Sequence, residues 1–186
     1  MMGTLNMIYY GGKELAASFR TVRASTVRIA EDIPEGKYEF SAAPDCRSIG
    51  RTLAHIAIGS GVQMHMHSNK IDDLKKVNFS ELMQKFGAEE AKPRTNAEII
   101  TLLNTEGDMF ALFLEGLSES FLAERVMMPP GAQPATKSRF EMLLSPKEHE
   151  MHHRGQLMML ERMLGLVPHL TRQFQARMAQ AQQAQQ

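Results

Sequence analysis

Four long segments of this chain carry apolar residues at the three- and four-residue spacing of an amphipathic helix, and this spacing constrains the fold most. In the first segment, for example, Leu15, Phe19 and Val22 share one stripe with Ile29 and Ile33. The sequence shows no internal repeat and no strand-length alternation of apolar and polar residues. It therefore predicts an all-α protein, a four-helix bundle built from about residues 13–33, 45–68, 95–117 and 138–164.

Start and stop signals support these boundaries. Pro34 follows the first segment, and Thr95 with Glu98 forms a capping box before the third. Gly165 comes at the end of the fourth segment, where a left-handed residue commonly closes a helix. The charged residues of the first segment fall mostly off its apolar stripe and are expected on the solvent-exposed face; they are Arg20, Arg23, Arg28 and Glu31.

The connections are less regular. Residues 69–94 are polar, with a short helix expected around 79–86, and residues 127–137 are rich in Pro and Gly and predict an irregular loop. Pro146 interrupts the fourth segment, where Ser145 begins a second capping box, so we expect a kink or a restart there. We assign residues 1–168 to the bundle and 169–186 to an Ala- and Gln-rich tail that is expected to be helical.

Composition excludes several classes of protein. The chain has 186 residues, with 21 Lys and Arg balanced by 21 Asp and Glu, so the basic excess of a nucleic-acid-binding protein is absent. No apolar run is long enough to span a bilayer, and the N-terminal sequence lacks the pattern of a secretory signal. A single cysteine, Cys46, excludes an internal disulfide. We expect a cytoplasmic protein that binds neither nucleic acid nor membrane.

Three histidines predict a metal site. His149 and His153 are four residues apart, so they share the helix face that continues into the bundle through Leu157 and Leu160. Two imidazoles on a core-facing stripe need polar partners, and a shared ion provides one for both. His55 lies within the buried stripes of the second segment, where Gly59 leaves space one turn later. We predict that these three histidines bind one divalent ion.

A three-histidine site leaves coordination positions open, as catalytic metal sites do. The residue types do not choose among Zn, Ni, Fe, Mn and Co. Such an ion can lower the pKa of a bound water or thiol. The pattern of His149, Glu150 and His153 also resembles the helix motif of zinc proteases, but the chain lacks the downstream ligand that those proteases need.

Other polar residues have two interpretations each. Glu150 is either an exposed helix carboxylate or an acid–base group beside the metal, and Glu106 lies either at the edge of the third apolar stripe or toward the ion. Arg154 either binds an anionic group of a substrate or pairs with a neighbouring acid, and Gln156 lies on the histidine face as a candidate cofactor-binding residue. The remaining histidines are expected at the surface, at the helix rim or in a loop: His65, His67, His152 and His169.

Two motifs resemble the DinB/YfiT-like family. They are RSIGRTLAH at residues 47–55 in the second segment and HEMHHRGQ at residues 149–156 in the fourth, which ends at a Leu-Gly pair. The resemblance covers roughly residues 10–168. It implies a four-helix bundle with crossover connections, a metal site at His55, His149 and His153, and homodimers.

The resemblance also implies a class of activity. Known members of the family use bacillithiol, mycothiol or glutathione in transfers and isomerisations, and related members resemble metal hydrolases. Our first hypothesis is a metal-dependent thiol S-transferase that acts on an electrophilic small molecule, with a low-molecular-weight thiol as co-substrate. The alternatives are metal-dependent hydrolysis of an amide or ester, with Glu150 or Glu106 as the base, and a metal-stabilised binding or stress-response bundle without turnover.

Overall fold

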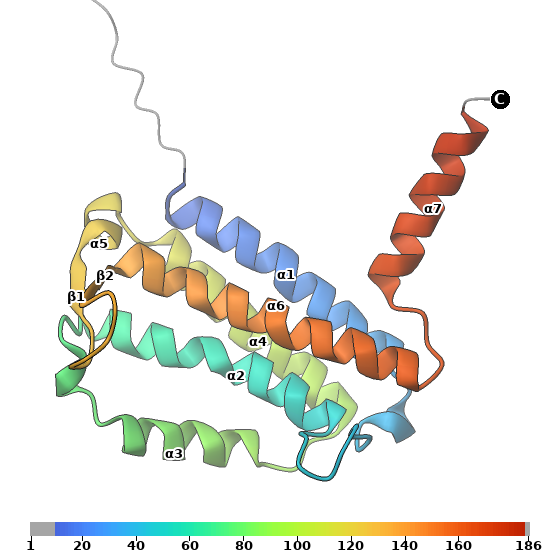
Figure 1. Ribbon diagram of the computed structural model, residues 1–186, viewed down its shortest axis with the longest axis horizontal. Coiled ribbons are helices and arrows are strands. Elements are labelled where there is room, and N and C mark those ends of the chain that lie inside the picture. Colours follow the sequence, from blue (N-terminus) through green and yellow to red (C-terminus); the bar gives the residue numbers. More distant parts are fainter. Residues whose placement is uncertain (1–9, 185–186) are drawn as a thin grey trace, which may run out of the picture.

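Within residues 10–184, which the computed structural model describes, four helices of 20 to 25 residues form a bundle (Figure 1): α1 (Gly12–Asp32), α2 (Ile49–Ser68), α4 (Asn96–Glu115) and α6 (Arg139–Met163). Both α1 and α2 pack against α4 and α6. The connections from α1 to α2 and from α4 to α6 therefore join helices that lie diagonally across the bundle. The all-α fold and its crossover connections are confirmed.

Apolar residues from these helices form two buried clusters. One contains Ile29 of α1, Leu53 of α2, Leu103 of α4 and Leu157 of α6, all fully buried. The other lies around Phe19 of α1, with Phe110 of α4 and Leu143 of α6. Burial of each large apolar side chain contributes about 1.5–3 kcal/mol. The spacing that predicts the helices is therefore the spacing that fills the core.

Arg23 is a correction to the predicted solvent-exposed face of α1. Its side chain is buried and donates from Nε and Nη2 to the carboxylate of Glu150 on α6, at 3.0–3.1 Å. The guanidinium also donates to the carbonyl oxygens of Leu103 on α4 and Ile56 on α2. Gly107 allows this approach, because a Cβ atom there would lie 2.9 Å from Cγ of Arg23. One arginine thus joins α1 to the three other bundle helices.

Pro146 neither stops nor restarts the last bundle helix. The helix α6 begins at Arg139 with a capping box of Ser138 and Glu141, and it continues through Pro146 to Met163. A proline inside a helix removes one backbone hydrogen bond and costs about 3 kcal/mol. Buried side chains on both sides of the proline, among them Leu143 and Leu157, hold the helix in the bundle. The expected restart of the helix at Pro146 is therefore wrong, because this packing keeps α6 continuous.

Shorter elements lie at the ends and on one side of the bundle. The helix α3 (Phe79–Glu90) packs against α2 and runs four residues beyond the predicted end. The prediction of an irregular loop over residues 127–137 is partly wrong. The two ends of this segment belong to a pair of antiparallel strands, β1 (Arg125–Met127) and β2 (Thr136–Ser138), which are too short to show alternation in sequence. The other elements are η1 (Glu35–Lys37), η2 (Leu74–Lys76), α5 (Glu119–Ala123), β1 (Arg125–Met127) and β2 (Thr136–Ser138).

The predicted helix of the tail is present as α7 (His169–Gln183), which projects away from the four bundle helices (Figure 1). Its first turn is anchored by an ion pair between Arg172 and Asp32, at the end of α1. None of the helices in the described part of the chain is both long enough and apolar enough to cross a lipid bilayer.

Candidate metal centre

The packing of α2 against α6 brings together the three histidines that the spacing singles out. Nε2 of His149 lies 3.0 Å from Nε2 of His55 and 3.0 Å from Nε2 of His153. Together they form a group with the spacing of metal ligands. Gly59 of α2 faces the ring of His149, because a Cβ atom there would lie 3.4 Å from Nδ1. The space predicted beside His55 is thus filled by the imidazole of His149.

Hydrogen bonds on the opposite side of two rings fix their orientation. Nδ1 of His55 lies 2.9 Å from Oε2 of Glu90, and Nδ1 of His153 lies 2.7 Å from Oε1 of Gln156. Because these oxygen atoms accept hydrogen bonds, each Nδ1 carries the proton and donates it. Each Nε2 then presents a lone pair toward His149.

Burial and the neighbouring imidazoles disfavour a positive charge on His149 and His153. Burial, together with the nearby His153 and His55, lowers the pKa of His149 to about 4. Burial also lowers the pKa of His153, although its hydrogen bond with Gln156 opposes this change. At neutral pH these imidazoles are therefore neutral, which is the form that binds a metal ion.

The residues present fit a divalent ion. Two lone pairs, from His55 and His153, face the single Nε2 of His149, and a proton on that atom can satisfy at most one of them. A cation among the three nitrogen atoms satisfies all of them. Three neutral imidazoles are a common ligand set for transition metals, and hydrogen bonds to their other ring nitrogen commonly orient such ligands.

Glu90 is a part of the site that the sequence analysis missed. It lies at the end of α3, almost fully buried, and accepts hydrogen bonds from His55 and from Nε of Arg47. Burial raises the pKa of Glu90, but these two hydrogen bonds outweigh that effect and the net pKa is lowered. A signal was available: Leu82, Phe86 and Glu90 recur every four residues, so one face of a longer helix carries all three.

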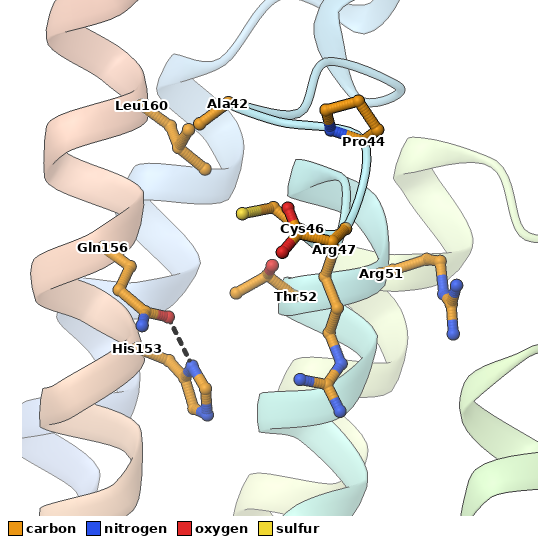
Figure 2. A pocket seen from close by; sticks show the side chains of 10 residues that line it. Ala42, Pro44, Cys46, Arg47, Arg51, Thr52, His153, Gln156 and Leu160 are labelled. Atoms are coloured by element: carbon orange, nitrogen blue, oxygen red, sulfur yellow. Dashed lines mark hydrogen bonds between the residues drawn. The ribbon is translucent and has the colours of Figure 1, made fainter.

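A cavity of about 670 Å³ opens beside His153 (Figure 2). Its walls come from the connector before α2, the first turns of α2, and α6. The wall is mixed, with apolar, cationic, carboxylate and thiol groups: Ala42, Pro44, Asp45, Cys46, Arg47, Arg51, Thr52, His153, Gln156 and Leu160. His153, one member of the histidine group, is therefore reachable by a small molecule from this side.

The four other predicted site residues differ in their position relative to the cavity and the histidines. Gln156 lines the cavity, whereas Arg154 is half-buried on α6 and is not among the lining residues. Glu150 is neither exposed nor directed to the histidines, because its carboxylate is held by Arg23. Glu106 is half-buried on α4 and is not part of the histidine group; burial raises its pKa, and the nearby Arg23 opposes this. The structure thus brings only one of these four to the cavity.

Two of the remaining histidines differ from the predicted surface position of His67 and the predicted loop position of His169. His67 is buried and lies 3.1 Å from Nη1 of Arg139, and burial lowers its pKa to about 4. His169 is buried at the first turn of α7 rather than in a loop. His65 and His152 are exposed, as expected.

Comparison with known proteins identifies a family. The family model described as "DinB family" matches residues 1–185. A search of curated protein sequences gives no significant match.

Solved structures share the fold. A DinB-like protein from Bacillus subtilis is 20% identical, with 82% of this chain and 92% of that chain covered and a TM-score of 0.61. YfiT from Bacillus subtilis, described as a probable metal-dependent hydrolase with an unusual four-helix bundle topology, is 11% identical, with 83% and 88% covered and a TM-score of 0.63. A mycothiol-dependent maleylpyruvate isomerase is 12% identical, with 80% and 61% covered and a TM-score of 0.60.

Proposed function

The chain belongs to the DinB family, and from this premise we propose that it is a metal-dependent enzyme that transfers a low-molecular-weight thiol to an electrophilic small molecule. The observation that carries the proposal is the convergence of three imidazoles beside a cavity of about 670 Å³. The cavity is large enough for a small thiol together with a second small molecule.

The side chains of the site have separate roles in this proposal. His55, His149 and His153 would hold a divalent ion such as Zn, Ni, Fe, Mn or Co. When bound, such an ion supplies Lewis acidity, which lowers the pKa of a thiol or polarises an electrophile. Glu90 and Gln156 hold two of the imidazoles in the orientation that this requires. Leu160 and Ala42 give the cavity an apolar portion against which a carbon skeleton can pack.

The reaction forms a bond between the sulfur atom and a carbon atom of the electrophile. The thiol proton is released to solvent, and a leaving group departs with the bonding electrons, or an added proton completes an addition. No carboxylate base is needed at the sulfur, because lowering the thiol pKa gives the nucleophile directly. This suits a site in which Glu150 is held by Arg23 and Glu90 by Arg47 and His55. The fold shared with a mycothiol-dependent enzyme supports the choice of a thiol.

A hydrolase is the second candidate, and Asp45 favours it. This exposed carboxylate lines the cavity that contains His153, so it is available as a general base for an attacking water. YfiT, which is described as a probable metal-dependent hydrolase, has the same fold. Asp45 replaces Glu150 and Glu106 as the base in this alternative, because neither of those carboxylates lines the cavity.

Turnover with and without added thiol separates the two candidates. We expect a chromogenic aryl halide to be consumed only with a thiol from a panel of bacillithiol, mycothiol and glutathione, at a rate that His149→Ala lowers at least 100-fold and Asp45→Asn leaves within a few-fold. Hydrolysis of a nitrophenyl ester without thiol, lost in Asp45→Asn, would instead support the hydrolase. Loss of thermal stability on metal removal with no substrate consumed would contradict both.

A further inference from the structure

Two arginines stand on the α2 side of the cavity, opposite His153 and Gln156 of α6 (Figure 2). The side chains of Arg47 and Arg51 are 43% and 59% exposed, so their guanidinium groups are open to a ligand. Arg47 also lies beside the metal centre, because Glu90 accepts hydrogen bonds from both Nε of Arg47, at 2.6 Å, and Nδ1 of His55, at 2.9 Å. A molecule that fills the cavity therefore meets His153 and both arginines, since all three line it.

Arg47 is held in place without using its terminal nitrogen atoms. Its Nε donates to Oε1 of Glu90 at 2.6 Å, and within residues 10–184 neither Nη1 nor Nη2 has a hydrogen-bond partner. Because Glu90 is itself almost fully buried, it fixes the position of the guanidinium group. The two free nitrogen atoms can donate to a ligand with little further loss of side-chain freedom.

The balance of charges on the α2 side of the cavity also favours binding of an anion. Glu90 is the carboxylate nearest to both arginines, at 2.6 Å from Arg47 and 3.6 Å from Arg51, and it also accepts a hydrogen bond from His55. One negative charge is thus shared by two guanidinium groups. Asp45 lines the same cavity, but it forms no ion pair with either arginine in the described part of the chain.

We propose that Arg47 and Arg51 form a binding subsite for an oxyanion, a carboxylate or a phosphate, carried by the small molecule that occupies this cavity. A planar guanidinium group binds either oxyanion through two parallel hydrogen bonds, which gives orientation as well as affinity. The inference rests on the proposed function for the claim that the reacting end of the same molecule lies at the three histidines. It adds a class of substrate, an anionic electrophile or an anionic thiol.

Equilibrium binding of two probes tests this subsite without turnover. Succinate and inorganic phosphate are titrated separately into the purified protein by calorimetry at low ionic strength, and metal content is measured for every variant. We expect saturable binding of at least one probe, weakened at least tenfold in Arg47→Gln with Arg51→Gln, because charge-assisted hydrogen bonds contribute that much or more. Tighter binding of succinate assigns the subsite to a carboxylate, and tighter binding of phosphate assigns it to a phosphate.

Arg28→Gln is the matched control, because Arg28 is similarly exposed and also pairs with a glutamate, but on α1. Arg51→Gln alone should also weaken probe binding, and it separates this effect from damage to the metal site, since within residues 10–184 no hydrogen bond or ion pair joins Arg51 to a histidine ligand. The inference is overturned if the wild type binds neither probe, if the double variant binds as the wild type does, or if Arg28→Gln weakens binding equally. Probe binding through both arginines without thiol-dependent turnover would contradict the proposed function and leave the subsite standing.

Discussion

Replacing Arg23 with alanine is expected to lower the free energy of unfolding by about 3–5 kcal/mol. The substitution leaves the carboxylate of Glu150 buried without its cation and removes the hydrogen bonds to the carbonyl oxygens of Leu103 and Ile56. Chemical denaturation followed by circular dichroism measures this loss. Because Glu150 lies next to His149 in α6, the same variant should also bind divalent metal less tightly.

Arg20→Ala is the control for Arg23. Arg20 also lies on α1 and pairs with Glu115 of α4, but both side chains are more than a third exposed. Its loss should lower the free energy of unfolding by about 1 kcal/mol or less. A double variant with Arg23→Met and Glu150→Leu should recover much of the stability, because no charge is then buried. A loss of less than 1 kcal/mol in Arg23→Ala itself would contradict the role of this ion pair.

Replacing Glu161 with glutamine is expected to stabilise the protein at neutral and alkaline pH. The carboxyl group of Glu161 is fully buried, and neither of its oxygen atoms has a hydrogen-bond partner in the described part of the chain. Burial, with a contribution from Asp32, raises its pKa from 4.5 to about 7, although Arg172 and Arg162 oppose the change. The folded protein therefore keeps this proton at pH values where the unfolded chain has lost it.

The sign of the pH dependence follows from this difference. Between about pH 4.5 and 7 the folded state binds more protons than the unfolded state, so the contribution of Glu161 to stability falls as the pH rises. The total loss is about 3 kcal/mol. Glu161→Gln should match the wild type near pH 4.5 and exceed its free energy of unfolding by about this amount at pH 8. Denaturant titrations at several pH values measure the difference.

Glu148→Gln is the matched control, because Glu148 is an exposed carboxylate on the same helix. It should change the free energy of unfolding by less than about 0.5 kcal/mol at every pH. A constant difference between Glu161→Gln and the wild type from pH 4.5 to 8 would show that Glu161 is ionised in the folded protein across this range.

Much of the fold could be predicted from the sequence because local signals and packing agree. Leu53, Leu103 and Leu157 lie on apolar stripes in sequence and in the buried core of the structure. Thr95 and Glu98 form the predicted capping box of α4. The histidine site could be predicted for a related reason. A polar residue on a core-facing stripe, such as His55 or His153, needs a polar partner in the core.

What the sequence could not provide depends on contacts between distant elements. Arg23 lies four residues after Phe19 and so on the buried stripe of α1, but a charged residue there becomes interpretable only when Glu150 is known to face it. Glu90 acquires its role only because α3 packs against α2. From residue type alone, both Arg23 and Glu90 would be predicted at the surface. The prediction of homodimers stays a prediction.

The central claim is that three histidines from two helices hold one divalent metal ion. Its most direct test is the metal content of the wild type and of His55→Ala, measured by elemental mass spectrometry after reconstitution and removal of free metal. We predict close to one ion per chain in the wild type and almost none in His55→Ala, since His55 is the ligand that α2 contributes. A wild type without metal, or a His55→Ala variant that retains it, would contradict this account.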